Sequence, residues 1–280
     1  MIKIEKYLFF VLLAVALFVA NSSLAAIERL PATNTKSGRP VVSIPAHAIE
    51  VSKNVFSLGE SVDPESGRKV EGFLIVHPRA ASAKPDGTPG NGNAGKGSKC
   101  YTFLASSAKW KSSESWVVNP SNNSGISDAS IFSILDDSIS KWESAAGVNI
   151  LGFGSITSDT LEANLSFMDG LNEVYFAPLD EGTIGITIVW GVFGGPPSGR
   201  ELLEWDQVYS TEYDWSLDGS VLTMDFDNIT THELGHSVGL GDLYDTSCSS
   251  QTMYGYADYS ETNKRTLESG DVEGIRKLYR

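Results

Sequence analysis

The sequence predicts an α/β fold with a twisted mixed sheet of about five strands and three helices. A middle segment places its apolar side chains on one helical face, at Ile131, Ile134, Leu135, Ile139 and Trp142. Three later runs are rich in β-branched and aromatic residues and are separated by Gly, Pro and Asp, at 172–179, 183–191 and 202–211. A hydrophobic share of 41% in 280 residues suffices for one sizeable core.

The first part of the chain contains short β-like runs. Segments 55–59 and 70–77 flank the turn-rich segment 63–69, DPESGRK, and predict a hairpin. A further short β piece is expected at 41–45, VVSIP. Segment 84–99 has almost no apolar residue and is rich in Gly, Pro and Asn, so we expect a flexible linker there.

The linker divides the chain into a small front part and a larger back part. This arrangement suits a prosegment at 26–83, which cleavage in the linker would remove, followed by the main domain at 100–280. The alternative is a minor accessory module at 26–83 that stays attached.

The main domain begins with a strand at 113–120, which Pro120 ends. Ser127 or Asp128 can cap the following helix, and Asp227 is placed to cap a second one. A last helix is expected at about 270–279, where apolar residues recur at helical spacing.

The chain begins with the features of a secretory signal peptide. Lys3 and Lys6 precede a continuous apolar run at 7–20, and small residues follow, so we expect a signal peptide at 1–25. The alternative is a membrane anchor, but the run is shorter than the ~20 apolar residues that a spanning helix needs. A secreted, extracellular monomer without stable membrane association is the expectation. The formal net charge of -14 argues against nucleic-acid binding.

The stretch THELGHSVGLGDLYD, 231–245, carries the chemistry. On a helix, positions i and i+4 lie on one face, so His232 and His236 can present two imidazoles to one metal ion, with Glu233 beside them. Gly239 can take a positive φ, end the helix and turn the chain back, which brings Asp242 toward the same metal.

The number of histidines after the linker restricts which residue can be the third metal ligand. Only His232 and His236 lie after the linker, because His47 and His77 precede it, so a three-histidine site within the main domain is excluded. Zinc accepts carboxylate oxygen, and catalytic sites keep three protein ligands with a fourth position open to water. His232, His236 and Asp242 satisfy that requirement, with Glu233 as the base that takes the proton of the water. The alternative for Asp242 is a surface carboxylate, with Asp245 or solvent completing the metal sphere.

These residues resemble a known family. HELGHSVGLGD is similar to the metzincin motif HExxHxxGxxH/D, in its matrixin form. The resemblance implies a zincin-like α+β metzincin architecture, a zinc endopeptidase and a methionine packed beneath the metal, for which TMYGY offers Met253. LESGDVEGIRKLY, 267–279, also resembles the closing helix of matrixins.

The chain also departs from the matrixin pattern. Aspartate is the minority third ligand, and Gly255 stands where matrixins usually place a proline after the Met-Tyr pair. The front part has no cysteine, so the cysteine switch of the family, a prosegment thiolate on the zinc, has no residue there.

Cys100 and Cys248 are the only two cysteines, and in an oxidising compartment we expect them to pair. The alternative is a free Cys100 thiolate that reaches the metal and holds the enzyme latent. Calcium is a second candidate cofactor, with Asp206, Asp214 and Asp218 as candidate ligands.

In a fold of this kind, the strand 183–191 borders the substrate cleft, and its free edge would pair with an extended peptide or an unfolded protein segment. Candidate cleft residues are Ile184, Gly185, Ile186, Tyr254 and Tyr256. The sequence therefore predicts a secreted zinc endopeptidase. Two alternatives stay open: a non-catalytic secreted zinc-binding module, and a zinc amidase that acts on a non-protein amide.

Overall fold

Residues 39–80 and 99–280 are described in the computed structural model of the chain. The predicted signal peptide at 1–25 and nearly all of the predicted linker at 84–99 lie outside these residues. Within the described ranges, no helix is both long and apolar enough to cross a membrane.

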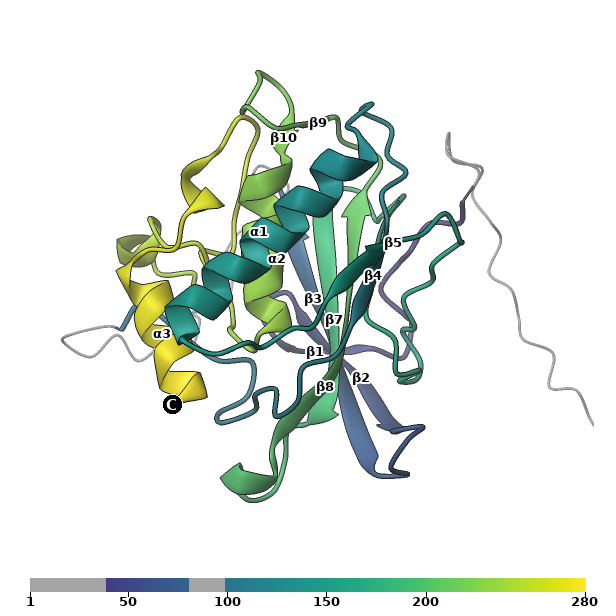
Figure 1. Cartoon of the computed structure of the whole chain (residues 1–280), viewed down its shortest axis with the longest axis vertical. Coiled ribbons are helices and arrows are strands. Elements are labelled where there is room, and N and C mark those ends of the chain that lie inside the picture. Colours follow the sequence, from purple (N-terminus) through teal and green to yellow (C-terminus); the bar gives the residue numbers. More distant parts are fainter. Residues whose placement is uncertain (1–38, 81–98) are drawn as a thin grey trace, which may run out of the picture. The chain divides into compact units, whose positions relative to one another are not determined.

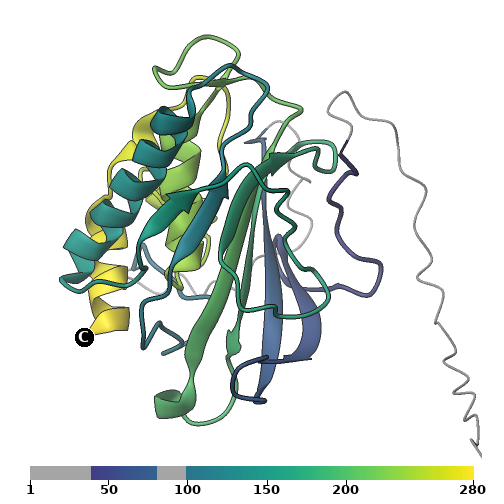
Figure 2. The ribbon, with the colours of Figure 1, turned by 45° about the vertical axis from the view of Figure 1, so that its right-hand side comes forward.

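The described residues form an eight-stranded mixed sheet with three helices on one of its faces (Figures 1 and 2). The strand order is β1-β2-β3-β7-β8-β6-β4-β5. Five of these strands belong to the back part, as predicted: β4 (Trp116–Asn119), β5 (Gly154–Ile156), β6 (Glu173–Ala177), β7 (Thr183–Val192) and β8 (Glu201–Ser210). A separate two-stranded sheet joins β9 (Trp215–Ser216) and β10 (Met224–Asp225).

The front part supplies the other three strands, β1 (Ile49–Ser52), β2 (Val55–Val62) and β3 (Lys69–Pro78). The predicted hairpin is confirmed, because β2 and β3 pair antiparallel. The β piece expected at 41–45 is wrong: only Val42 makes an isolated bridge, with Leu179. Prolines stand at both ends of this run, at Pro40 and Pro45, and proline lacks the N–H that a strand ladder needs.

The outer edge of β7, which the sequence predicts to be free, is occupied. β3 pairs antiparallel with β7 from Glu71 to Pro78, and the front part thereby continues the sheet of the back part. Gly72 allows a close approach, because a Cβ there would lie 2.6 Å from the Trp190 ring. The expectation of a free edge was wrong because it considered the back part alone.

Helix α1 (Asp128–Ala146) is capped by Ser127, whose side chain accepts a hydrogen bond from the Ser130 N–H. Helix α2 (Phe226–Ser237) is capped by Asp225, so the prediction of Asp227 as the cap is wrong by two residues. Asp227 lies in the first turn of α2, where a carboxylate is also stabilised by the helix dipole. Helix α3 (Ser269–Tyr279) agrees with the expected last helix.

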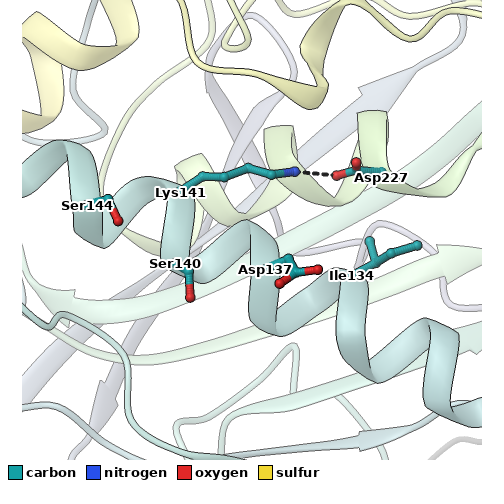
Figure 3. Close-up of a pocket in the computed structure, with 6 residues that line it drawn as sticks. All are labelled: Ile134, Asp137, Ser140, Lys141, Ser144 and Asp227. Carbon is teal, nitrogen blue, oxygen red and sulfur yellow. Dashed lines mark hydrogen bonds and ion pairs between the residues drawn. The ribbon is translucent and has the colours of Figure 1, made fainter.

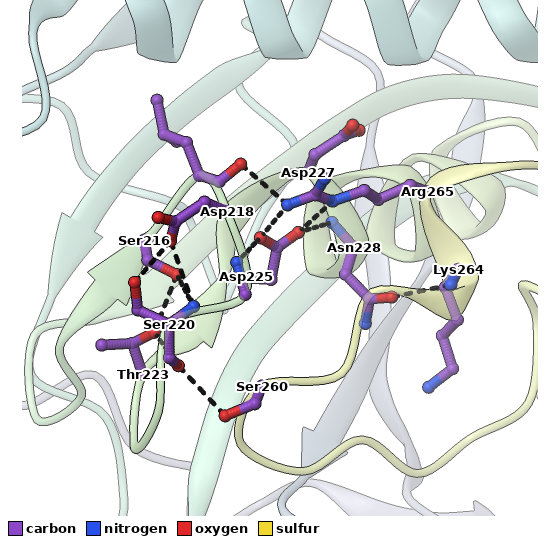
Figure 4. Close-up of polar contacts among 12 residues, drawn as sticks. Ser216, Asp218, Ser220, Thr223, Asp225, Asp227, Asn228, Ser260, Lys264 and Arg265 are labelled. Atoms are coloured by element: carbon purple, nitrogen blue, oxygen red, sulfur yellow. Dashed lines mark hydrogen bonds and ion pairs between the residues drawn. The ribbon is translucent and has the colours of Figure 1, made fainter.

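Polar contacts hold the first turn of α2 in place (Figure 4). Arg265 donates from both Nε and Nη2 to the Asp225 carboxylate, and its Nη2 also donates to the Leu217 carbonyl. On the other side, Lys141 of α1 donates to Asp227 at 2.6 Å. This ion pair lines a groove between α1 and α2, and none of the predicted site residues is among the residues that line it (Figure 3).

The core lies mainly between the helices and the sheet and is aromatic. All six tryptophans are buried, which agrees with packing rather than ligand stacking. The predicted disulfide between Cys100 and Cys248 is present, so a free Cys100 thiolate is excluded.

The calcium candidates do not come together. Asp206 is buried in β8, where it accepts a hydrogen bond from the Glu173 N–H, whereas Asp218 caps an exposed turn at Ser220. Among the described residues, the groups that could hold a metal ion contain none of Asp206, Asp214 and Asp218.

Glu204 gives a stability prediction. This residue is fully buried beside Asp206, and burial raises the pKa of Glu204 to about 8. The unfolded chain releases this proton near the ordinary pKa of about 4.5, so the native state loses stability as pH rises from there to about 8. Glu204→Gln should therefore raise Tm by several degrees at pH 8 and by less at pH 5. Equal shifts at both pH values in thermal unfolding would contradict this explanation.

Candidate metal centre

Helix α2 carries both histidines of the motif, and each imidazole is oriented by its second nitrogen. His232 Nδ1 donates to the Thr252 carbonyl at 2.7 Å, and His236 Nδ1 donates to the Leu240 carbonyl at 2.9 Å. A carbonyl can only accept, so Nδ1 carries the proton in both rings. This leaves each Nε2 free to ligate a metal ion.

Asp242 returns to the same point, as predicted. Gly239 adopts φ 102°, and the chain turns back directly after α2. Asp242 Oδ1 lies 3.2 Å from His232 Nε2 and 3.5 Å from His236 Nε2. Asp245, the alternative ligand, instead caps a short 3₁₀ helix at Thr246–Cys248.

The donor atoms fit a zinc ion. His232 Nε2, His236 Nε2 and Asp242 Oδ1 are buried, and none of the three has a hydrogen-bond partner among the described residues. Buried polar atoms normally find a partner, and a shared cation would satisfy all three at once. Two imidazoles and one carboxylate are a ligand set that zinc accepts.

Electrostatics favours a cation at this point. Burial opposes ionisation of Asp242, but attraction to His236 and His232 holds the pKa of Asp242 well below its usual value. Despite burial, the same carboxylate raises the pKa of His236 to about 9, whereas burial and the neighbouring His77 lower the pKa of His232 to about 3.

Met253 packs beneath the two histidines. It is buried, and a Cβ built on Gly235 of α2 would lie 2.1 Å from its sulfur, so the methionine lies directly against the helix between His232 and His236. The contact explains why position 235 is a glycine.

Glu233 projects from the same helix with its two carboxylate oxygens on different partners. Thr187 Oγ1 of β7 donates to Oε2 at 2.6 Å, and His77 Nδ1 of β3 lies 3.0 Å from Oε1. Burial raises the pKa of Glu233, although His232 and His236 oppose this rise. A higher pKa makes Glu233 a better proton acceptor.

A sequence model of the matrixin family matches residues 108–280. The chain belongs to the matrixin family. Zinc is the metal that the family implies. The chain is also similar to human matrilysin, with 36% identity over 74 residues. That match covers 26% of this chain and 26% of matrilysin.

One residue of this matrixin outside the predicted site holds the turn that carries Thr252 and Met253. Asp271 of α3 accepts hydrogen bonds from the Thr252 and Met253 N–H groups, at 2.8 and 3.2 Å, as well as from Glu268 N–H. Thr252 in turn orients His232 through its carbonyl. The acidic residue in the first turn of the closing helix was the available signal.

Asp271→Ala should weaken zinc binding about 10- to 100-fold, because the carbonyl that orients His232 loses its anchor. Competition with a chelator measures this change. Glu273→Ala, an exposed position on the same helix, is the control and should leave zinc affinity unchanged. An unaltered affinity in a folded Asp271→Ala variant would remove this role.

His77 is the second residue that sequence reasoning missed. It lies opposite Gly185 in the β3–β7 register, and its ring centroid lies 4.1 Å from that of His232. The alternation of side chains along the strand could have indicated this position. Phe73 and Ile75 face the helices, and His77 is the next residue on the same face. His77 was not considered a site residue, because only the histidines after the predicted linker were counted and His77 lies before it.

The predicted cleft residues divide into two groups. Ile184 and Ile186 are buried in two different core clusters, whereas a Cβ on Gly185 would lie 3.3 Å from Glu233 Oε1. Tyr254 and Tyr256 form an edge-to-face pair 5.8 Å apart. Tyr256 also contacts Tyr244, whose hydroxyl lies 3.0 Å from Asp242 Oδ2 and is placed to donate to it.

Proposed function

We propose that this matrixin is a secreted zinc-dependent endopeptidase that cleaves extended segments of extracellular proteins. One observation carries the proposal: three unpartnered donor atoms of His232, His236 and Asp242 meet beside Glu233, a buried carboxylate with a raised pKa. Bound zinc would supply a Lewis acid that polarises water and the peptide carbonyl. The predicted signal peptide at 1–25 supports secretion.

Glu233 moves the protons. Thr187 occupies Oε2, so Oε1 is the oxygen that accepts a proton from the attacking water once the front part has left. The same oxygen then delivers this proton to the leaving amine. Thr187 fixes the carboxylate for both transfers.

The edge of β7 supports an extended peptide as substrate. It already accepts a strand, β3, by backbone pairing, and an added strand is a common mode of peptide recognition. In this proposal 26–83 is a prosegment, and cleavage in 84–99 vacates the edge for substrate. Gly185 then lies beneath the peptide, where a side chain would press on Glu233.

Limited proteolysis tests the proposal, because the linker offers Lys96 and Lys99 to trypsin. We expect the secreted chain to contain one zinc and to hydrolyse an unfolded protein after the front part is removed. Cleavage of simple amides but not of proteins would favour the amidase. A zinc-containing, front-free chain that hydrolyses neither would favour the non-catalytic binding module.

A further inference from the structure

Helix α2 carries a buried amide on the same face as the metal-binding histidines. Asn228 lies four residues before His232, so its side chain is one helical turn nearer the start of the helix. Its Oδ1 accepts a hydrogen bond from the Lys264 N–H at 2.7 Å, which fixes the orientation of the amide. The other amide atom, Nδ2, is buried and has no hydrogen-bond partner among the described residues. Buried donors normally find an acceptor, so this one is available to a ligand.

Lys264 adds a buried ammonium next to this amide. It belongs to the short 3₁₀ helix Asn263–Arg265 and is 1% exposed. Its Nζ donates to the Tyr256 carbonyl, and the Glu261 carboxylate lies 3.6 Å away, beyond hydrogen-bond length. An ammonium has three donor hydrogens, so Lys264 can donate to a further acceptor. In Figure 4 its ammonium and the Asn228 amide nitrogen lie on the same side of the hydrogen bond that joins the two residues.

The front part shows the path that an extended peptide takes past this place. After β3, Arg79 N–H donates to a carbonyl directly before β7 at 2.9 Å, and Ala80 N–H donates to the Ala257 carbonyl at 2.8 Å. The chain therefore lies between the edge of β7 and segment 254–258. Tyr256 directly precedes Ala257, and its carbonyl binds the Lys264 ammonium. A peptide on the same path passes beside the residues that hold this ammonium.

The charge of Lys264 also acts on the residues of the reaction centre. Burial lowers the pKa of Lys264, whereas nearby carboxylates, including Asp242 and Glu233, oppose this effect. Burial lowers the pKa of His77 as well, and the positive charge of Lys264 lowers it further. His77 is the residue of the front part that contacts Glu233, so the ammonium lies near the place that substrate would occupy.

We propose that Asn228 and Lys264 form the base of a substrate subsite that selects a carboxylate side chain, Glu or Asp, at a residue flanking the peptide bond that is cut. This inference rests on the proposed function and names the substrate preference of the same site. A carboxylate accepts hydrogen bonds from both the amide and the ammonium, and its charge stabilises the buried cation. An apolar side chain would leave both donors without an acceptor.

Paired peptides test this preference on the trypsin-treated chain. The members of a pair differ only by Glu against Gln at a residue flanking the bond that is cut, and no peptide contains Lys or Arg, so residual trypsin leaves it intact. We expect kcat/KM for the Glu peptide to exceed that for the Gln peptide by about 10- to 100-fold. Lys264→Met should abolish this preference. Lys277→Met, which changes an exposed lysine of α3, is the control and should keep the wild-type ratio.

Asn228→Asp covers the case in which Lys264→Met does not fold. Aspartate keeps an oxygen that accepts from the Lys264 N–H, but it replaces the amide donor by a second carboxylate oxygen. That oxygen repels a substrate carboxylate, so the Gln peptide should be cleaved at least as fast as the Glu peptide.

Equal kcat/KM for both members of each pair in the wild type would overturn the subsite, while the endopeptidase proposal would stand. A preference for Glu that persists in both variants would place the selecting group elsewhere and would also refute the assignment. If the treated chain cleaved neither the peptides nor an unfolded protein, the proposed function would fail and this inference with it.

Discussion

Glu233→Gln should lower hydrolysis of an unfolded protein by about 10²- to 10⁴-fold after the front part is removed, with zinc content unchanged. Glutamine keeps the shape of the side chain and can still accept from Thr187, but it cannot accept a proton. The loss should lie in kcat rather than in KM, because no ligand of the metal and no residue of the β7 edge is altered.

Glu212→Gln is the matched control, since Glu212 is exposed and its side chain is in none of the contacts at the site. It should retain full activity. If Glu233→Gln retained most of the wild-type rate while zinc stayed bound, Glu233 would not be the base, and the mechanism given above would fail.

Asp242→Ala should reduce zinc affinity more than ~100-fold, a larger effect than loss of a supporting contact such as Asp271. The two histidines alone give a two-ligand site, and removal of the carboxylate also leaves the Tyr244 hydroxyl without this acceptor. Zinc content after dialysis against a weak chelator measures the change, and activity should disappear in parallel.

Asp245→Ala separates this prediction from a general effect of acidic residues in the loop. Asp245 caps the 3₁₀ helix at Thr246–Cys248, so its removal should lower stability slightly and leave zinc affinity unaltered. If Asp245→Ala lost zinc and Asp242→Ala kept it, the roles of the two carboxylates would be exchanged.

Local periodicity predicted much of this fold. The helical spacing in α1 and the β-branched runs of β6, β7 and β8 identified their elements, because each of them buries one face or both against a common core. The zinc motif likewise fixed His232, Glu233 and His236 on one helix, and Gly239 predicted the turn toward Asp242. These features depend on residues close together in the chain.

Features that depend on distant partners were not predictable in the same way. Asp227 was predicted as the cap of α2, but Asp225 is the cap, and it is bound by Arg265, 40 positions later in the sequence. β5 has only three residues and needs β4 to be recognised. His77 reaches Glu233 across 156 positions, and only the β3–β7 pairing brings them together.

The disulfide between Cys100 and Cys248 ties the start of the back part to the loop after the zinc motif, and no such bond holds the front part. While the chain is intact, the contact between β3 and β7 is intramolecular, so it does not depend on the protein concentration. One cut in 84–99 turns the same contact into an association between two molecules. After the cut, the fraction of β3 that stays bound to β7 would depend on protein concentration. On dilution the front part would dissociate, whereas the disulfide would still hold the start of the back part in place.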